Sequence, residues 1–217
     1  MFEKKKLSQA LKLLKMLYLN RDTKYPNEVS GFENRYAKFI GTDYALSFCN
    51  GTTAFDSALF SLGLRDGDSI ILCGMNFQSV VLTSLQSRLR LKYVDMDENL
   101  NTRLDDTYVD ENTKLIIISH LFGNPQNMDE VTKFVKKHNL LLLEDCSHAH
   151  GAEFNGSKVG NFGDVSFFSL QGEKAISGGE AGVAITNNKE CYDRMRLYAH
   201  MGRDMSDIEV DALFRGR

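Results

Sequence analysis

Short apolar runs alternate with amphipathic segments along most of this sequence. Seven runs have the length and composition of strands: Tyr44–Cys49, Ser69–Cys73, Leu91–Asp95, Lys114–Leu121, Leu140–Asp145, Val165–Leu170 and Ala181–Thr186. Helical patterns lie between or beside them: Thr53–Leu62, Ser79–Ser87, Met128–His138 and Lys189–His200. Strands separated by helices need crossover connections, which build a parallel sheet with helices on both faces. We therefore predict an α/β fold with a mostly parallel seven-stranded sheet, in which the last two runs, lacking an intervening helix, can pair antiparallel.

Two further helical patterns precede the first strand. Apolar residues recur at helical spacing from Leu7 to Leu17, and again from Phe32 to Ile40 after Pro26. We expect an N-terminal helical segment over residues 1–30 and one large domain over residues 31–203. Lys12 and Lys15 interrupt the first pattern, which favours an amphipathic helix over a secretory leader. No apolar run approaches the roughly 20 residues that a membrane span needs, so we expect no membrane association.

Composition narrows the class of protein further. The 26 basic and 29 acidic residues give a net charge of -3, which argues against binding nucleic acid through bulk electrostatics. The four cysteines are scattered without a C-x-x-C pair, so neither a disulfide framework nor a zinc site is expected. These features together indicate a protein of the reducing cytoplasm.

The segment Cys49-Asn50-Gly51-Thr52-Thr53 follows the first predicted strand and opens the next helix. Gly51 permits a tight turn, and a helix N-terminus offers free N–H groups and the positive end of its dipole. Thr52 and Thr53 add hydroxyl donors, so this turn can bind a phosphate. An ordinary helix cap is the alternative, because Asn and Thr favour that position for local reasons.

A second candidate follows the leucine-rich strand, in the segment Glu144-Asp145-Cys146-Ser147-His148-Ala149-His150. A buried strand that ends in an acid places a carboxylate at the ligand edge of the sheet, where a protonated pyridine nitrogen could neutralise it. The alternatives are a helix cap for Asp145 and structural imidazoles for His148 and His150. A metal pair formed by these two histidines lacks a further cluster of ligands in the sequence.

The third candidate is Lys174, which follows the strand Val165–Leu170 and precedes the glycines Gly178 and Gly179. A lysine held near the ligand edge and partly desolvated favours its neutral amine, the form that attacks an aldehyde. Small neighbours leave room for a cofactor beside it. The alternative is a solvated surface lysine.

Taken together, these segments resemble the DegT/DnrJ/EryC1/StrS family of sugar aminotransferases, which use pyridoxal 5'-phosphate (PLP) and have the aspartate-aminotransferase fold. The resemblance covers about residues 30 to 203. In chain order its motifs are Phe32-Glu33 with Tyr36-Ala37, Asn50-Gly51-Thr52-Thr53-Ala54, Phe77, His120-Leu121-Phe122-Gly123, Asn127-Met128-Asp129, Glu144-Asp145 to His150-Gly151, Phe168-Ser169 with Lys174, Gly179-Glu180, and Arg196 with His200 and Gly202.

The resemblance assigns roles within a PLP site. Thr52, Thr53 and Ser169 would contact the phosphate at the turn formed by Gly51, and Asp145 would hold the pyridine nitrogen. Lys174 would form the Schiff base and move the proton. His148 would lie near the ring oxygen. Phe77 would stack on the ring, with core packing as its alternative.

The implied reaction moves an amino group from an amino acid, usually glutamate, to a nucleotide-linked keto-sugar for cell-surface polysaccharide or related sugars. The implied assembly is a homodimer. A PLP-dependent sugar dehydratase is a second possibility, although those relatives carry His where this chain has Lys174. A non-catalytic PLP-fold protein that serves as a binding or partner subunit is a third. A Rossmann nucleotide-binding protein is a fourth, weakened by the absence of G-x-G-x-x-G after the first strand.

The length of the chain departs from the family pattern. Family members continue into a smaller C-terminal domain, which shapes the sugar pocket, and a loop containing asparagine reaches the partner's site. Neither is found before Arg217. We therefore expect residues 204–217 to be a truncated tail, with the C-terminal small domain absent.

Overall fold

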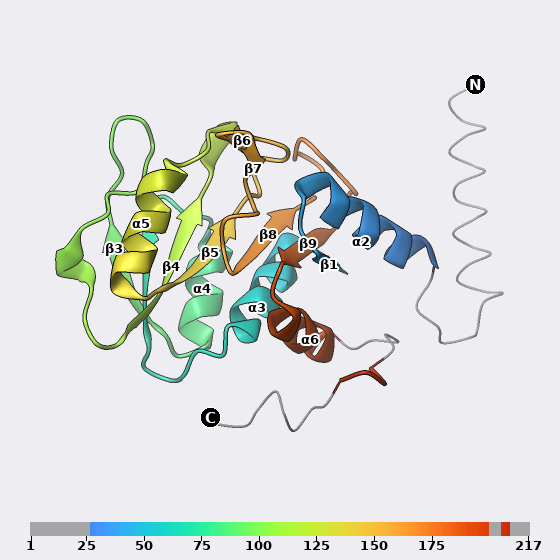
Figure 1. The fold of residues 1–217 in the computed structure, drawn as a ribbon, viewed down its shortest axis with the longest axis horizontal. Helices are drawn as coiled ribbons and strands as arrows, with labels where there is room; N and C mark the ends of the chain where they lie inside the picture. The colour runs from blue at the N-terminus through green and yellow to red at the C-terminus, as the bar shows by residue number, and fades with distance from the viewer. Residues whose placement is uncertain (1–26, 200–204, 209–217) are drawn as a thin grey trace.

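The computed structural model describes residues 27–199 and 205–208 (Figure 1). The leucine pattern predicted to form an N-terminal helix, His200 and Gly202 lie outside this part of the chain. The helices are α2 (Asn27–Ile40), α3 (Gly51–Ser61), α4 (Gln78–Gln86), α5 (Met128–His138) and α6 (Lys189–Tyr198). The strands are β1 (Tyr44–Phe48), β2 (Ser69–Cys73), β3 (Arg90–Val94), β4 (Thr113–Ser119), β5 (Leu141–Asp145), β6 (Glu153–Phe154), β7 (Ser157–Lys158), β8 (Val165–Ser169) and β9 (Gly182–Thr186).

Seven strands form one sheet in the order β1-β9-β8-β5-β4-β2-β3. The pairs β8–β5, β5–β4, β4–β2 and β2–β3 are parallel, whereas β9 is antiparallel to both β8 and β1. The predicted α/β class, the mostly parallel sheet and the antiparallel pairing of the last two strands are thus confirmed. Because β9 alone is reversed, the carboxyl ends of the other six strands meet at one edge of the sheet.

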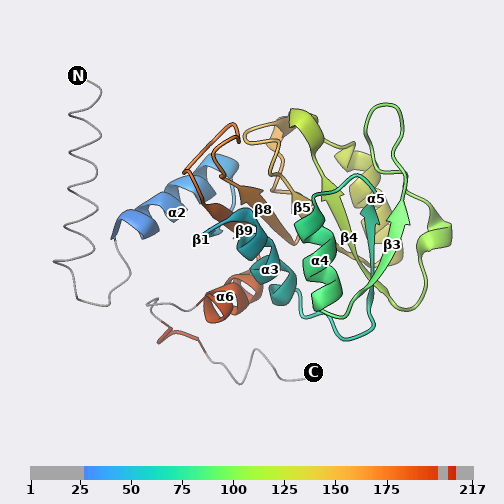
Figure 2. The same ribbon diagram turned by 180° about the vertical axis from the view of Figure 1, so that it is seen from behind.

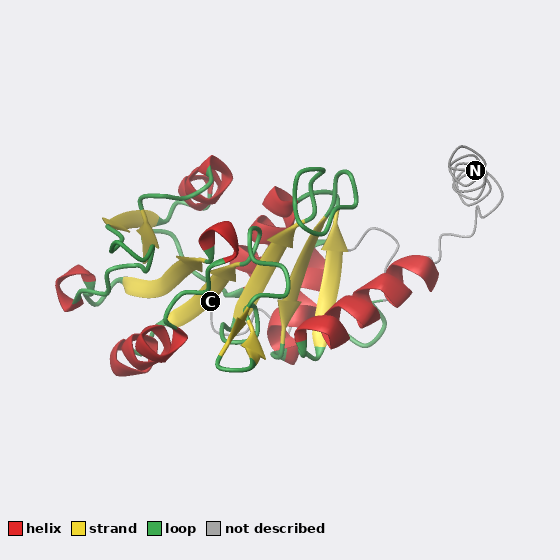
Figure 3. Ribbon diagram, turned by 90° about the horizontal axis from the view of Figure 1, so that it is seen from above, coloured by secondary structure: helices red, strands yellow, loops and turns green. Residues whose placement is uncertain are grey.

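Helices cover both faces of this sheet, as the view from above shows (Figure 3). Phe55 of α3, Val80 of α4 and Met195 of α6 join the core cluster on one face, the face turned toward the viewer in Figure 2. Tyr36 of α2 and Phe134 of α5 belong to the two clusters on the other face. Alternate strand residues point to opposite sides, and strands buried on both faces therefore read as continuous apolar runs.

Local signals fix the ends of the helices. Asn50 caps α3 in a capping box with Thr53, and Asn188 accepts the amides of Glu190 and Cys191 at the start of α6. Asn139 ends α5 in the left-handed conformation, with φ at 52°. The predicted strands and the helices from α3 on start and end within about two residues of the observed ones, whereas α2 begins at Asn27, five residues before the predicted Phe32.

Several short elements of the structure were not predicted from the sequence. They are the 3-10 turns Asp106–Tyr108 and Leu121–Gly123 and the small hairpin of β6 and β7. The predicted strand Lys114–Leu121 ends at Ser119, and the chain after it turns instead of continuing the strand. Each of these elements is too short to produce an apolar period.

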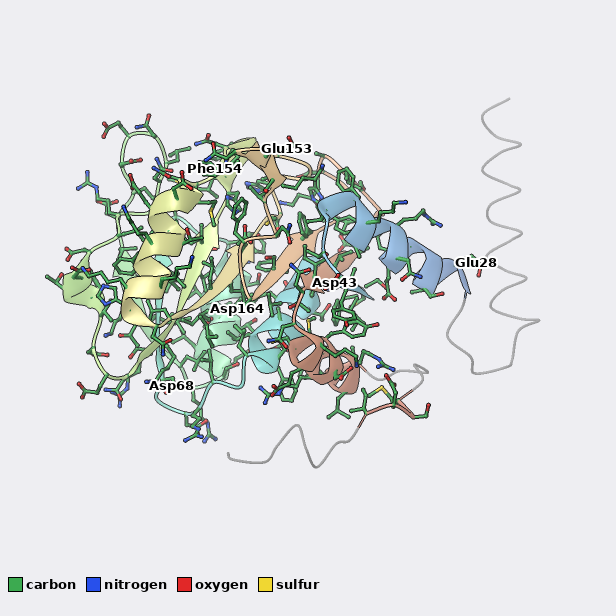
Figure 4. All side chains as sticks on the ribbon, viewed as in Figure 1. Glu28, Asp43, Asp68, Glu153, Phe154 and Asp164 are labelled. Atoms are coloured by element: carbon green, nitrogen blue, oxygen red, sulfur yellow. The ribbon has the colours of Figure 1, made fainter. Side chains whose placement is uncertain are left out.

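The two edges of the sheet differ in character. Asp68 and Asp164 directly precede β2 and β8 at the amino-end edge, while Glu153 and Phe154 of the small hairpin lie toward the opposite end (Figure 4). Asp164 is structural, since its carboxylate accepts the Leu142 amide at 2.8 Å and so fixes the start of β5.

None of the helices in the described ranges combines the length and the apolarity needed to cross a bilayer.

Candidate active site

A cavity of about 630 Å³ opens at the carboxyl-end edge of the sheet. The segments that follow β1, β2, β4, β5 and β8 contribute its walls, as expected for a ligand site in an open α/β sheet. Seven of the eight predicted site residues line it: Gly51, Thr52, Phe77, Asp145, His148, Ser169 and Lys174. Residues separated by more than 120 positions in the sequence therefore meet in one place.

The predicted phosphate turn is packed too closely for side chains at two positions. A Cβ on Gly51 would lie 2.7 Å from Ser169 Cβ, and a Cβ on Gly182 would lie 2.2 Å from the Asn50 carbonyl oxygen. Glycine at these positions lets the N-terminus of α3 rest directly on β8 and β9. The amides of the first turn of α3 and the Ser169 hydroxyl are thereby held together beside the cavity, an arrangement suited to an anion.

Thr53 is the predicted site residue that does not line the cavity. Its amide donates to Asn50 Oδ1 at 2.9 Å, and its hydroxyl donates to the Asn50 carbonyl at 3.0 Å. The hydroxyl is therefore engaged in the capping box, and its contact with a phosphate stays a prediction. The helix-cap alternative is confirmed for Thr53, whereas Gly51 and Thr52 face the cavity and remain the predicted phosphate contacts.

Asp145 ends β5 with its side chain in the cavity and only 8% of its surface exposed. Its Oδ1 accepts the Ser147 amide at 3.0 Å, and no ion pair engages it within residues 27–199 and 205–208. Burial raises the pKa of this carboxyl above its usual value, against the opposing effects of Ser147 and of the nearby histidines. A buried acid in this state lacks a cationic partner, and a protonated ring nitrogen supplies one.

Lys174 lies in the loop between β8 and β9 and lines the same cavity as Asp145. Its amide donates to the Gln171 carbonyl at 2.9 Å, and the Leu170 amide donates to the Ala181 carbonyl at 2.8 Å. These bonds close the loop at the ligand edge. The lysine thus faces the cavity from a loop whose ends are fixed to the sheet.

Aromatic side chains form the rim of the cavity. Phe77 is 66% exposed, so it does not serve the core, and Phe122 is 75% exposed. The Phe122 ring lies 5.6 Å from the His148 ring. Burial, with the adjacent charge of Lys174, lowers the pKa of His148, which favours a neutral imidazole in the cavity. An apolar ring could bind between these groups.

His150 does not line the cavity, but it contacts the backbone of Ser169, which does. Its Nε2 donates to the Ser169 carbonyl at 2.9 Å, so its Nδ1 accepts the Tyr36 hydroxyl at 3.0 Å. Burial lowers the pKa of this imidazole. The alternative of a structural imidazole therefore describes His150, which links α2 to the backbone of the predicted phosphate contact.

His120 and Glu144 both belong to the motifs of the family resemblance, but the sequence does not indicate that their side chains form a buried pair. His120 Nδ1 accepts the Gln126 amide at 3.0 Å, so its Nε2 carries the proton donated to Glu144 Oε2 at 2.9 Å. Burial acts to raise the pKa of Glu144, but the bonds from His120 and from loop amides hold it below its usual value. The amides belong to Gly160, Phe162 and Gly163, and the Ser166 hydroxyl adds a fifth donor.

This cluster has the residue types of a metal site, and Cys146 completes it. Ligand atoms of His120, Glu144 and Cys146 lie within 4.8 Å of one another. However, five donors already engage the Glu144 oxygens, and both nitrogens of His120 are hydrogen-bonded. The arrangement is a satisfied hydrogen-bond network that fixes the end of β5 and the loop before β8.

The cavity as a whole offers a helix N-terminus suited to an anion, an amine, a buried acid with no ion-pair partner among the described residues, and an apolar rim. These features fit a flat aromatic group with a phosphate, a basic ring nitrogen and an aldehyde. Pyridoxal 5'-phosphate has this chemistry, so the residues present match the cofactor expected from the resemblance.

Comparisons with known proteins agree with this description. The DegT/DnrJ/EryC1/StrS aminotransferase family matches residues 6–212. GDP-perosamine synthase from Escherichia coli O157:H7 is 36% identical over 179 residues, which make up 81% of this chain and 49% of that protein. The chain spans about half the length of the curated relatives it matches.

Solved structures give the same result for the fold. Helicobacter pylori PseC, an aminotransferase of pseudaminic acid biosynthesis, superposes with a TM-score of 0.78 at 28% identity, over 86% of this chain and 52% of that one. E. coli GDP-4-keto-6-deoxy-D-mannose-3-dehydratase with bound hydrated PLP gives a TM-score of 0.76 at 31% identity, over 80% and 47%. The fold is that of the fold type I PLP enzymes, and this chain belongs to the DegT/DnrJ/EryC1/StrS aminotransferase family.

Proposed function

We propose that this protein is a PLP-dependent aminotransferase that moves an amino group from an amino acid, with glutamate as the expected donor, to a nucleotide-linked keto-sugar. The observation that carries the proposal is Asp145, a buried carboxylate without a cationic partner among the described residues, in the cavity that also contains Lys174. A structural acid in this position would be expected to have an ion-pair partner.

Each residue of the site has a distinct task in this proposal. The first turn of α3 and the Ser169 hydroxyl bind the phosphate and so set the position of the cofactor. Asp145 keeps the ring nitrogen protonated, and Phe77 covers the ring. When bound, the cofactor supplies an electron sink for the carbanion of the amino acid. The Lys174 amine holds the cofactor covalently and, once released, carries the proton between the substrate carbon and the cofactor.

The resemblance and the relatives support the substrate class. GDP-perosamine synthases are among the curated relatives, and PseC is an aminotransferase involved in the biosynthesis of pseudoaminic acid. A sugar dehydratase also superposes well, but a lysine in the cavity favours amino transfer over dehydration. The expected homodimer and the cytoplasmic location belong to the same proposal.

Cofactor capture by the 217-residue chain tests the proposal directly. The purified protein should turn yellow with PLP, and borohydride reduction followed by peptide mass spectrometry should place the cofactor on Lys174. Lys174→Ala should abolish both signals. Lys133→Ala, at an exposed lysine on α5, should leave both unchanged. A colourless wild-type protein would contradict the proposal.

Addition of glutamate then separates an aminotransferase from a subunit that only binds the cofactor. Conversion of the yellow form to the colourless amine form, with release of the keto acid, supports amino transfer. Persistent colour with no keto acid would indicate a chain that holds PLP without completing the half-reaction.

A further inference from the structure

Buried polar atoms without a hydrogen-bond partner are unusual in proteins. Two of those found among the described residues, Ser119 Oγ and Asn76 Nδ2, belong to residues that line the cavity. Ser119 is the more constrained of the two, since only 2% of its surface is exposed. Its hydroxyl therefore has no hydrogen-bond partner in the part of the chain that the structure describes, and it is shielded from solvent.

Ser119 is the last residue of β4, and its register partner on β5 is Asp145. Ile117 and Leu143, two positions earlier on these strands, both pack into the core cluster with α3. Because side chains two apart on a strand share a face, Ser119 and Asp145 both project toward the side of the sheet that α3 covers. The unpaired hydroxyl is thus a neighbour of the unpaired acid.

Other buried serines in this protein show that the fold can satisfy such a hydroxyl. Ser84 donates to the Val80 carbonyl at 2.7 Å, and Ser61 donates to the Ala58 carbonyl at 2.7 Å. Strand β4 is otherwise apolar from Leu115 to Ile118. A hydroxyl at the cavity end of this strand destabilises the free protein unless a ligand pairs with it.

We propose that Ser119 is a further cofactor-contact residue, whose hydroxyl binds the ring-nitrogen edge of PLP beside Asp145. This inference rests on the proposed function and adds a second polar contact at the ring nitrogen. The hydroxyl can accept from the protonated nitrogen and turn its own proton toward the carboxylate. Two acceptors would then face one ring edge, which favours the protonated ring over the neutral one.

Ser119→Ala tests this contact, with Ser57→Ala as a matched control. Ser57 is also fully buried, and its hydroxyl has no partner within residues 27–199 and 205–208, but it lies on α3 and does not line the cavity. Both variants should be at least as stable as wild type in the free state, measured by urea denaturation, because each loses an unpaired hydroxyl. In a fluorescence titration with PLP, only Ser119→Ala should weaken binding, by about tenfold, which corresponds to about 1.4 kcal/mol.

An analogue of PLP with carbon in place of the ring nitrogen locates the contact. The difference between wild type and Ser119→Ala should disappear with this probe, because the nitrogen edge no longer donates. A difference that persists would place the hydroxyl elsewhere and overturn the proposal. Equal PLP affinity in the two serine variants, or a free Ser119→Ala protein less stable than wild type, would also overturn it.

These outcomes are distinct from a failure of the proposed function. If wild type does not bind PLP, the cavity is not a PLP site and the proposed function is refuted. If wild type binds PLP through Lys174 and Ser119→Ala titrates like Ser57→Ala, only the role of Ser119 falls.

Discussion

Glu144 and Asp145 are adjacent buried acids with opposite protonation tendencies. Consecutive strand residues point to opposite faces, so Glu144 meets five hydrogen-bond donors while Asp145 enters the cavity with hydrogen bonds from Ser147. The pKa of Glu144 is lowered despite its burial, and burial raises that of Asp145. Glu144 therefore stabilises the fold as an anion, whereas the ionised form of Asp145 would be stabilised by a cation in the cavity.

Glu144→Gln should destabilise the protein at neutral pH by about 3 kcal/mol, because an amide group would face donors that now bind a carboxylate. Since the pKa of Glu144 is lowered in the folded state, its contribution is present above the unfolded value, about 4.3. It is lost as the pH falls through the folded pKa. Urea denaturation at neutral and acidic pH measures this, and the variant should lose less stability than wild type on acidification.

Glu153→Gln provides the matched control for this prediction. Glu153 is exposed on the small hairpin and pairs with Lys158 at 3.1 Å, and exposed pairs contribute about 0–1 kcal/mol. Equal effects of the two substitutions would refute the role assigned to the buried network.

The cavity position of Asp145 could be predicted from the sequence, whereas the hydrogen-bond network of Glu144 could not, and the difference has a physical reason. An acid at the end of an apolar strand marks the ligand edge of a parallel sheet, so the pattern itself indicates a site. The donors to Glu144 come from His120, from the loop 160–163 and from Ser166 on β8, and none of these segments has a pattern that reveals the contact. Thr53 illustrates the converse, because composition alone could not separate a capping hydroxyl from a phosphate ligand.

At the scale of elements, the contact between β9 and the turn before α3 positions the predicted phosphate contacts. A Cβ at Gly182 would lie 2.2 Å from the Asn50 carbonyl oxygen, a backbone atom that cannot rotate away. Gly182→Ala should therefore displace the turn, lower the free energy of unfolding by about 1–3 kcal/mol, and weaken PLP binding. Thermal unfolding and a PLP titration measure the two effects.

Gly74→Ala is the appropriate comparison, because the nearest atom to its Cβ would be the Val94 carbonyl oxygen at 4.0 Å. It should change neither stability nor affinity appreciably. Full PLP affinity in Gly182→Ala would mean that the turn does not depend on the close approach of β9.

The types and the order of the helices and strands could be predicted because strands buried on both faces of a sheet consist of nearly continuous apolar residues. The β4–β5–β8 centre of the sheet is the clearest example, with strands such as Leu141–Asp145. The pairing order of the strands was not predictable from any one run, since it depends on crossovers between distant segments. The hairpin of β6 and β7 has two residues per strand, too few for a period.

At the scale of the whole molecule, the rim of the cavity includes large apolar side chains that are exposed to solvent. Met75 is 53% exposed and Phe122 is 75% exposed, and both line the cavity. Contiguous exposed apolar residues often mark interfaces, in line with the homodimer that the resemblance implies. We expect wild type to be dimeric in size-exclusion chromatography with light scattering, and Phe122→Ser to shift it toward the monomer.

Leu85→Ser serves as the control, because Leu85 is 52% exposed on α4 and does not line the cavity. It should leave the dimer intact. A monomeric wild type, or equal behaviour of both variants, would argue that the rim serves only the ligand.

The reversed direction of β9 has a consequence for how the amine can move. A crossover after β8 would carry the chain to the far end of the sheet, whereas the antiparallel return leaves both ends of the loop 170–181 at the same edge. Opening of this loop requires no strand to change its pairing. In the proposed function, the Lys174 nitrogen would therefore withdraw from the cofactor ring and return to it while Asp145 and the turn before α3 keep their positions, so the loop would move against a fixed sheet edge.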